Sequence, residues 1–365
     1  MDRRSWLKGA GLAALGAGLG PACGVSYRVS EAAREFARVN VSWDRIIRTV
    51  VGLRPYRSSG FRVEKENFGR KTIVHNYGHG GRGISLSWGT SHLAVEQALK
   101  TTPTRYAVVG CGALGLATAH LLQRKGLEVT IYAKDLPPET TSDIAEAVWE
   151  ASLPTGPDVS IDFRQQYERV ARLSHAYFQK MVGDYYGVRW MEFYSEASEE
   201  ERLDHDRESP LADLFPNFRE LDGKQHPFPA SDVLRWSTML IETPIYLKAL
   251  IRDFQLAGGR IVVREFADLE ELLALSEDVI LNCTGLGARI LFDDEELMPI
   301  KGQLTILLPQ PEIDYMVDIV HHMVPRKDGI LLAGTWEPGV ETLEPDPEAI
   351  RRVMNSHMEF FEKMK

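Results

Sequence analysis

Cysteine is scarce in this chain: only Cys23, Cys111 and Cys283 occur among 365 residues. Three cysteines are too few for a disulfide framework, which would be possible if the protein were exported. Positive charge is also in deficit, because 42 Lys and Arg stand against 52 Asp and Glu, a formal net charge of −10. No basic stripe offsets this deficit, so nucleic acid is not expected as a partner. Beyond the N-terminal segment the chain also lacks internal repeats and low-complexity stretches, which excludes repeat architectures.

The apolar run near the N-terminus is shorter than the roughly 20 residues that a membrane-spanning helix needs. Residues 1–25 instead have the order of a secretory signal peptide, with Arg3 and Arg4, then the apolar run, then small residues around Ala22. RRSWLK resembles a twin-arginine export signal. We therefore expect the protein to use the export machinery and reach the periplasm. A lipid anchor at Cys23 is a weaker alternative, because no apolar residue stands three positions before it.

The length admits two domains or one large α/β unit, and an apolar fraction of 44% suits a sizeable core. The stretch YAVVGCGALGLATAHLLQRKGLEVTIYAK predicts a buried strand, a glycine turn, a helix and a second strand over residues 105–133. Further helices are predicted over 161–182, from Thr243 as N-cap, and from Asp346 as N-cap to Lys365. Asp328-Gly329 predicts a hairpin. Parallel strands near the glycines and a hairpin near residue 330 indicate a nucleotide-binding domain interleaved with an antiparallel-sheet domain.

Residues 110–115 fit the pattern GxGxxG, directly after a strand and at the start of a helix. Gly110 permits a tight turn, Gly112 lets a pyrophosphate approach the backbone, and Gly115 lets the helix pack close to the strand. The N–H groups of the helix start then face the phosphates. This context predicts a dinucleotide site, against the alternative of a purely structural turn. An NAD-dependent dehydrogenase also fits this motif taken alone.

The second strand should end with an acidic residue that binds the ribose, and Asp135 serves with a shift of one residue. Lys134 is either a solvated lysine or a neighbour of a phosphate. Three hydroxyls follow at Thr140, Thr141 and Ser142. They donate to a phosphate, or else Ser142 or Asp143 caps a helix.

Five segments resemble the D-amino-acid oxidase family of FAD-dependent flavoproteins. They are VVGCGALGLATA, IYAKDLPPETTSDIAEAVWE, VILNCTGLGA followed by PIKGQL, GLRPYRSSGFRVEKE, and HNYGHGGRGISLSWG. In that family the last two segments follow the others, whereas here they come first, at residues 52–89. The chain therefore looks circularly permuted, with residues 101–104 as the new linker, since chain termini often lie close together. An unrelated leading domain over residues 26–100 is the alternative.

The resemblance implies an α/β fold with a Rossmann-like FAD-binding domain and an interleaved antiparallel-sheet substrate domain. The FAD-binding domain is expected over 45–150 and 262–300, the substrate domain over 151–261 and 301–345, and a C-terminal helix over 346–365. In addition to Asp135, predicted above from its place after the second strand, the resemblance implies a set of cofactor-binding residues. They are Gly110, Gly112, Ala113, Leu114, Gly115, Thr140, Thr141, Ser142, Val148, Thr284, Gly80, Gly81, Gly83, Ile84 and Ser85.

Glycines 80, 81 and 83 let the main chain approach the flavin ring and direct N–H dipoles toward the negative charge of its reduced form. For this reason we expect Gly81 to be a catalytic residue. The family's arginine for the substrate carboxylate falls on Arg54, since a guanidinium matches a carboxylate bidentately. The family's tyrosine beside that carboxylate is replaced by His322, which donates one hydrogen bond when neutral and adds charge when protonated.

Two other residues near these motifs, Glu150 and Arg326, bear on the substrate, and one histidine pair raises the question of a metal site. Glu150 stands where the family usually has an uncharged amide near the flavin. Arg326 is either a second anion contact or a charge beside the hairpin turn, and we favour the latter. A metal site is not expected, because adjacent strand residues such as His321 and His322 point to opposite faces.

The resemblance implies oxidative deamination of D-amino acids, or of related small amino acids, with FAD as cofactor and oxygen as the acceptor that becomes hydrogen peroxide. A dehydrogenase with another acceptor, or a flavin-binding protein without turnover, is the alternative. The sequence fixes neither the preferred side chain nor the oligomeric state, and a homodimer stays open.

Overall fold

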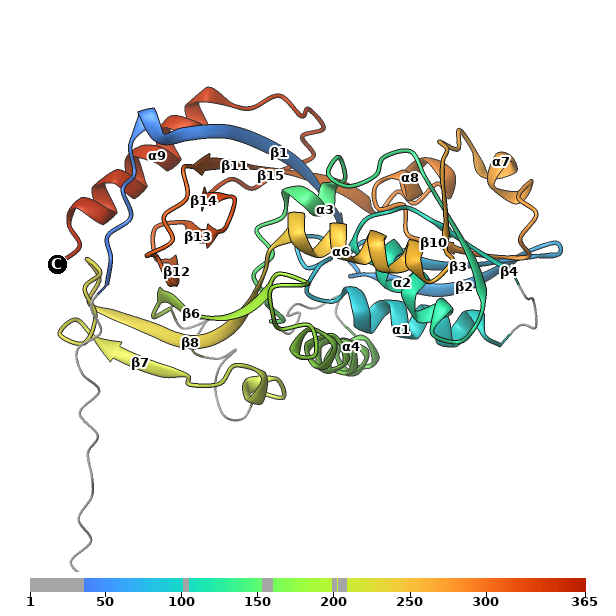
Figure 1. Cartoon of the computed structure of the whole chain (residues 1–365), viewed down its shortest axis with the longest axis horizontal. Helices are drawn as coiled ribbons and strands as arrows, with labels where there is room; N and C mark the ends of the chain where they lie inside the picture. The colour runs from blue at the N-terminus through green and yellow to red at the C-terminus, as the bar shows by residue number, and fades with distance from the viewer. Residues whose placement is uncertain (1–35, 101–104, 153–159, 199–201, 203–208) are drawn as a thin grey trace, which may run out of the picture. The chain divides into compact units, whose positions relative to one another are not determined.

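The computed structural model describes residues 36–100, 105–152, 160–198, 202 and 209–365 (Figure 1). The expected signal peptide over 1–25 and the expected linker over 101–104 lie outside the described residues. Within these ranges no helix combines the length and the apolar character needed to cross a membrane. The helical elements are η1 (Trp43–Arg45), α1 (Ser87–Ala98), α2 (Ala113–Gln123), α3 (Thr141–Ile144), α4 (Ile161–Gln179), η2 (Ala212–Leu214), α6 (Thr243–Leu256), α7 (Leu269–Leu273), α8 (Gly287–Leu291) and α9 (Pro347–Glu362).

The strand–glycine–helix–strand unit lies in a six-stranded sheet of the described residues. The spatial order is β2 (Arg62–Phe68), β3 (Lys71–Tyr77), β10 (Val279–Asn282), β4 (Arg105–Val109), β5 (Glu128–Ala133) and β9 (Arg260–Val263). All neighbours are parallel except the β2–β3 pair, which is antiparallel. The parallel pairing of β4 with β5, joined through α2, confirms the predicted βαβ opening.

Both faces of this sheet are buried. Val108 of β4 packs in the same cluster as residues of α1 and α2, whereas its neighbour Ala107 packs with Leu272 of α7 and Leu291 of α8. Because successive strand residues point to opposite faces, a strand covered on both sides must be apolar throughout. The uninterrupted apolar run at residues 106–109 has this cause.

Whereas the six-stranded sheet lies at the right of Figure 1, the second sheet has nine strands, most of which lie at the left. Its order among the described residues is β1 (Ile46–Arg57), β11 (Leu297–Leu307), β14 (Gly329–Leu332), β13 (His322–Arg326), β12 (Tyr315–Asp318), β6 (Val188–Glu196), β8 (Asp232–Ile241) and β7 (Arg219–Asp222), with β15 (Glu337–Pro338) paired to β11. It is antiparallel except for the β12–β6 pair. The antiparallel β13–β14 pair confirms the hairpin predicted at Asp328-Gly329.

The segment of residues 46–77 contributes strands to both sheets. Strand β1 pairs with β11 from Ile46 opposite Leu307 to Arg57 opposite Leu297. Strand β3 lies between β2 and β10 in the other sheet. Thus β1, from the stretch expected to belong to the FAD-binding domain, lies in the nine-stranded sheet.

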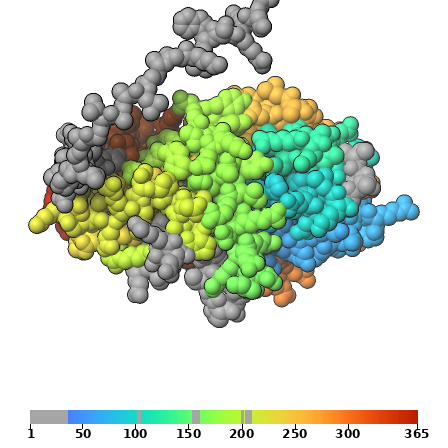
Figure 2. Space-filling view, turned by 90° about the horizontal axis from the view of Figure 1, so that it is seen from below, coloured from blue at the N-terminus to red at the C-terminus, as the bar shows by residue number. Residues whose placement is uncertain are grey.

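Helix α4 packs closely against α1. A Cβ atom at Gly89 of α1 would lie 2.1 Å from the carbonyl oxygen of Val170 in α4, so only glycine fits there. The Gly89 N–H also donates to the hydroxyl of Ser174 at 2.8 Å. Figure 2 shows the green segment that contains α4 beside the cyan residues of α1 and α2. The last glycine of HNYGHGGRGISLSWG therefore has a packing role.

One of the two predicted helix caps is correct. Asp346 caps α9 by accepting from the Glu348 N–H at 2.8 Å, as predicted. The prediction of Thr243 as N-cap of α6 is wrong, because Glu242 holds that position. The Thr243 hydroxyl is engaged elsewhere, donating to the Asp143 carbonyl at 3.0 Å and accepting from Arg326 at 2.8 Å.

Candidate active site

The glycine turn between β4 and α2 has no room for side chains. Gly110 has a φ of +112°, and a Cβ there would lie 2.3 Å from the carbonyl oxygen of Cys283. A Cβ at Gly115 would lie 2.0 Å from the carbonyl oxygen of Gly110, so the first turn of α2 packs directly on the strand end. At Gly112 a Cβ would meet the Ser142 hydroxyl at 2.8 Å. Gly110 and Gly115 are therefore required by geometry, whereas a side chain at Gly112 would displace the Ser142 hydroxyl.

Residues far apart in the sequence meet at this helix start. The Ser142 hydroxyl accepts from the Ala113 N–H, the first of α2, at 3.0 Å. The Thr284 N–H lies 3.5 Å from the Cβ position of Gly110, beyond the end of β10. Leu114 continues the first turn of α2. The structure thus brings the predicted diphosphate-binding residues of the glycine turn together with Ser142 and Thr284.

Thr140 and Thr141 start the short helix α3. Thr140 is its N-cap, and its hydroxyl and N–H both contact the Asp143 carboxylate, at 2.7 and 3.2 Å. The cap predicted at Ser142 or Asp143 is therefore wrong in its position, because Thr140 is the N-cap and Asp143 is its partner in a capping box. The Ser142 hydroxyl instead accepts from the Ala113 N–H of α2. Asp135 follows the end of β5 with its side chain 51% exposed. Its carboxylate lies 3.9 Å from Lys134, a largely exposed lysine.

The glycine loop that precedes α1 lies between two parts of the site. The Gly80 N–H donates to the Pro55 carbonyl at 2.8 Å, which fixes the loop on β1. A Cβ at Gly81 would lie 3.7 Å from the Arg54 side chain. On the other side the Ser85 hydroxyl lies 3.3 Å from the Val148 carbonyl and accepts from the Glu150 N–H. Gly83 and the buried Ile84 complete the loop.

The histidines of the same segment are buried within the protein. His79 contacts the Thr90 hydroxyl at 3.0 Å, and burial lowers the pKa of His79 to about 3. His75 contacts Asn282, and burial together with the charge of Arg62 lowers the pKa of His75 to about 4. Both are therefore neutral at physiological pH. The part of the chain that the structure describes contains no group of three residues able to hold a metal ion.

This arrangement fits FAD. Gly110, Gly112 and the N-terminal N–H groups of α2 would hold the diphosphate, with Ser142 and Thr284 beside it. Gly81, beside Arg54, and Ser85 and Val148, which contact each other, would line the flavin ring. Asp135, two residues after the end of β5, would bind the ribose.

Arg54 has an incompletely satisfied guanidinium. Its Nη1 is buried and has no hydrogen-bond partner among the described residues. Nη2 lies 4.0 Å from Glu146, at the limit of an ion pair, and the guanidinium carbon lies 5.3 Å from the centre of the Trp336 ring. A Cβ at Gly302 would lie 2.0 Å from Nη1, so the guanidinium lies directly over this glycine of β11. A buried donor without a partner is costly, which indicates a site for an anion.

His322 lies between two carboxylates. Its Nδ1 is 2.5 Å from Glu146 and its Nε2 is 2.8 Å from Asp318. Burial would lower the pKa of His322, but the charges and hydrogen bonds of Glu146 and Asp318 outweigh burial and raise it well above its usual value. Burial would raise the pKa of Glu146, but His322 and Arg54 outweigh this and lower it. In this geometry both ring nitrogens of His322 are engaged, so neither is directed at a ligand.

Glu150 and Arg326 have identifiable partners. Glu150 is 48% exposed, lies 3.3 Å from Arg82 and accepts from the Ser152 hydroxyl. Arg326 is buried, contacts both oxygens of Asp328 in the hairpin turn, and donates to the Ala145 carbonyl at 3.1 Å. Its guanidinium therefore ties the hairpin to the segment that carries the candidate site, rather than providing an additional anion contact.

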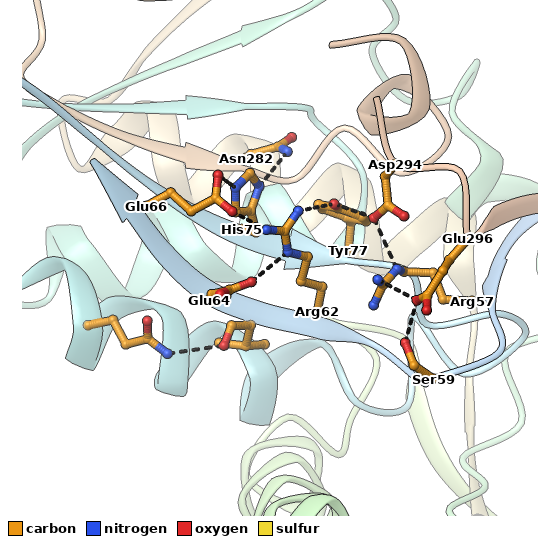
Figure 3. A network of polar contacts seen from close by, with 12 residues as sticks. Arg57, Ser59, Arg62, Glu64, Glu66, His75, Tyr77, Asn282, Asp294 and Glu296 are labelled. Atoms are coloured by element: carbon orange, nitrogen blue, oxygen red, sulfur yellow. Dashed lines mark hydrogen bonds and ion pairs between the residues drawn. The ribbon is translucent and has the colours of Figure 1, made fainter. Parts of the chain in front are cut away.

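A polar network fastens β2 and β3 to residues near the start of β11 (Figure 3). Tyr77 donates to Asp294 at 2.6 Å and accepts from Arg62 at 3.0 Å. Arg57 forms ion pairs with Asp294 and Glu296 at 3.0 and 2.6 Å. Figure 3 shows Arg62 reaching from β2 toward Glu64, Glu66 and Tyr77. Each arginine of this network has carboxylate partners within the network.

Four residues of the candidate site were not predicted from the sequence: Glu146, Asp318, Gly302 and Trp336. Glu146 stands in the segment that resembles the family, so its acidic side chain gave a signal that could have been followed. Gly302 lies opposite Gly52 across the β1–β11 pair, and only this pairing places it below Arg54.

Comparisons with known proteins agree with this geometry. The family model described as FAD dependent oxidoreductase matches residues 105–364. A D-amino-acid oxidase of Rubrobacter xylanophilus is 30% identical over 257 residues, covering 68% of this chain and 75% of that oxidase. Human D-aspartate oxidase is 28% identical over 263 residues, covering 69% of this chain and 74% of the human protein.

Solved structures show a similar fold. Glycine oxidase of Geobacillus kaustophilus matches with a TM-score of 0.55 at 17% identity, over 72% of this chain and 80% of that one. The L-α-glycerophosphate oxidase of Mycoplasma pneumoniae, a structure with FAD bound, also gives a TM-score of 0.55 at 17% identity, over 73% of this chain and 80% of that one.

Proposed function

This chain belongs to the family of FAD-dependent oxidoreductases, and we propose that it oxidises D-amino acids. The products are imino acids, which water hydrolyses to keto acids and ammonia. The observation that carries this proposal is the buried Nη1 of Arg54, a donor without a partner among the described residues, next to the glycine loop expected to line the flavin. The D-amino-acid oxidase and D-aspartate oxidase named above support the substrate class.

Arg54 orients the substrate. Its guanidinium binds the α-carboxylate through Nη1 and a second guanidinium nitrogen, and these two parallel hydrogen bonds fix the direction of the rest of the molecule. Gly302 allows the guanidinium to lie flat on β11, and the Trp336 ring lies beside it. Holding the carboxylate in this way places the Cα–H bond at one position instead of many, which lowers the entropic part of the barrier.

The glycine loop supplies the electrostatics. FAD, when bound, supplies the two-electron acceptor for the Cα–H bond, and the protein residues supply position and charge. Backbone N–H groups around Gly81 and Gly83 stabilise negative charge, and only glycines let the main chain approach this closely. No side chain is required to accept a proton when the amine binds in its neutral form.

The electron acceptor is oxygen in this proposal. One molecule each of D-amino acid, oxygen and water then gives one keto acid, one ammonia and one hydrogen peroxide. Peroxide yield compared with reduction of an artificial acceptor distinguishes an oxidase from a dehydrogenase. Little peroxide together with rapid dye reduction would assign a dehydrogenase.

The test starts with the absorption spectrum of the purified protein and a panel of D-amino acids. We expect a flavin spectrum that bleaches under anaerobic conditions with D- but not L-amino acids, and peroxide in air. A bound flavin that no amino or imino acid bleaches would instead identify a flavin-binding protein without turnover.

We also propose that residues 36–100 are the family's C-terminal segment in a permuted position. In support, the family match begins at residue 105, while β1 and β3 are inside the two sheets rather than in an appended domain. A rearranged chain, in which residues 36–100 follow residue 365 after a short flexible linker, should fold and bind flavin. A rearranged chain that is expressed but binds no flavin would contradict the permutation.

Export is a separate proposal that rests on the sequence of residues 1–25 alone. The protein would reach the periplasm through a twin-arginine pathway, which carries folded proteins and so allows FAD to bind first. Replacing Arg3 and Arg4 together by lysine should trap the protein in the cytoplasm. An unchanged distribution between the cell fractions would contradict this route.

A further inference from the structure

Glu146 is fixed by its two neighbours in the chain, one of which has a strained backbone. The next residue, Ala147, has a φ of +59°, which a residue with a Cβ rarely adopts. The carbonyl before Glu146, that of Ala145, accepts from the buried Arg326 at 3.1 Å, and the Ala147 carbonyl accepts from the Ile241 N–H at 2.9 Å. Strained conformations persist only where the surroundings enforce them, and they cluster at functional sites.

This position directs the Glu146 carboxylate between the two cations of the candidate site. One oxygen lies 4.0 Å from Nη2 of Arg54 and the other lies 2.5 Å from Nδ1 of His322, with the side chain only 16% exposed. Asp318 contacts the other ring nitrogen of His322 at 2.8 Å. Because carboxylates only accept, both ring nitrogens carry hydrogen and His322 is an imidazolium.

The charges of this cluster cancel. Arg54 and His322 are positive, and Glu146 and Asp318 are negative, so the site offers no excess positive charge. One substrate carboxylate is compensated by direct contact with Arg54. A second carboxylate on the same substrate would find no free cation within this cluster and would lie near Glu146.

We propose that Glu146 is a specificity-determining residue that disfavours D-amino acids with an acidic side chain and leaves neutral and cationic side chains acceptable. This inference rests on the proposed function, because it concerns the substrate that Arg54 holds. A side-chain carboxylate of an amino acid bound through Arg54 lies within about 10 Å of Glu146, and charges this close near a protein surface alter binding on the order of tenfold.

The test is Glu146→Gln, which keeps the shape and removes the charge. The measured quantity is the ratio of kcat/KM for D-aspartate to that for its uncharged analogue D-asparagine. Any loss of orientation affects both substrates and cancels in this ratio, whereas the charge effect does not. At pH 6 we expect the ratio to rise about tenfold, and the ratio for D-lysine over D-norleucine to fall.

The pH matters because Glu146 helps to keep His322 protonated. The charged and titratable groups that face His322 and the adjacent His321 are Glu146, Asp318, Arg54, and His357 and Arg352 of α9. In Glu146→Gln the imidazole keeps Asp318 but loses its other carboxylate partner, so the pKa of His322 should be lower than in the wild type. As the pH rises and the variant's imidazole loses its proton, the gain for D-aspartate should shrink. A packing defect would not have this pH dependence.

Glu96→Gln is the matched control, since it removes the same charge from an exposed carboxylate of α1 that pairs with Arg169. Its D-aspartate to D-asparagine ratio should stay at the wild-type value. A change of less than threefold in Glu146→Gln at pH 6, with the protein folded and flavin-loaded, would overturn the proposal.

A binding measurement separates this inference from the proposed function. Calorimetric titration of the flavin-loaded protein with succinate and with its monoamide succinamate needs no turnover. The preference for succinate should rise about tenfold in Glu146→Gln at pH 6, and a rise of less than threefold counts against the proposal. If wild-type protein oxidises no D-amino acid, the proposed function fails, and this titration still decides the role of Glu146.

Discussion

Arg54 and Arg57 lie three residues apart on β1 and differ in how their charges are compensated. Arg57 is 13% exposed and forms ion pairs of 3.0 and 2.6 Å with Asp294 and Glu296. Arg54 has a single ion pair at the 4.0 Å limit, and its buried Nη1 has no hydrogen-bond partner within the described ranges. A compensated charge stabilises the fold, whereas an uncompensated buried donor is tolerated where a ligand satisfies it.

His75 and His322, one near each arginine, also differ in how the protein sets their charge. His75, beside the Arg57 network, is kept neutral by burial, with its pKa lowered to about 4. His322, beside Arg54, is kept charged by two carboxylates, with its pKa raised despite burial. The network in Figure 3 therefore joins segments of the chain, and the cluster around Arg54 sets the charge of a binding site.

The largest expected effect is that of Arg54→Ala. Removing the carboxylate contact should lower kcat/KM for D-alanine about a thousandfold, or roughly 4 kcal/mol, as expected for a desolvated charge pair. Flavin content and melting temperature should stay close to wild type, because Arg54 has no strong partner in the protein. Steady-state kinetics together with thermal unfolding measure this. Normal activity in Arg54→Ala would show that the carboxylate binds elsewhere.

Arg57→Ala should reverse this pattern. It leaves the buried carboxylate of Asp294 without its cation, which costs about 3 kcal/mol of unfolding free energy. The KM for D-alanine should change little in the protein that stays folded. Chemical denaturation gives the free energy. Arg48→Ala is the control on the same strand, since its exposed pair with Asp328 contributes about 0–1 kcal/mol. Equal stability of the two variants would refute the structural role of Arg57.

The pH dependence of stability sharpens the contrast between the histidines. His75 is neutral in the folded protein down to a pKa of about 4, while the unfolded chain binds a proton below about 6.5. Stability therefore falls as the pH falls from 6.5 toward 4, by about 2 kcal/mol at pH 5. His75→Gln should flatten this acid slope in denaturation series between pH 5 and 7. His322 acts in the opposite direction, since its stabilisation is present at low pH and is lost as the pH rises through its raised pKa.

Gly302→Ala should have the smallest effect of the four. The added methyl group would lie 2.0 Å from Nη1 and displace the Arg54 guanidinium, which should raise the KM for D-alanine about tenfold and change kcat less. A double-mutant cycle checks the cause, because Gly302→Ala should cost nothing further once Arg54 is alanine. Additive losses would mean that Gly302 acts through the fold instead.

The parts of the fold predicted from the sequence are those set by local rules. The glycine turn before α2, the hairpin at Asp328-Gly329 and the cap at Asp346 each depend on a few consecutive residues. The cap predicted at Thr243 is wrong by one residue, because the helix already begins at Thr243 and Glu242 holds the N-cap position. The meeting of Glu146 with His322, 176 residues away, depends on how the two sheets pack, which no local pattern contains.

The most direct test removes either the substrate carboxylate or the arginine that is proposed to bind it. Anaerobic flavin reduction is measured with D-alanine and with D-alaninamide, which lacks the carboxylate, in wild type and in Arg54→Ala. The account predicts that wild type prefers D-alanine by about two or more orders of magnitude and that this preference collapses in Arg54→Ala, while reduction by D-alaninamide stays the same. A preference for D-alanine that survives in Arg54→Ala would contradict the assignment of Arg54 as the carboxylate-binding residue.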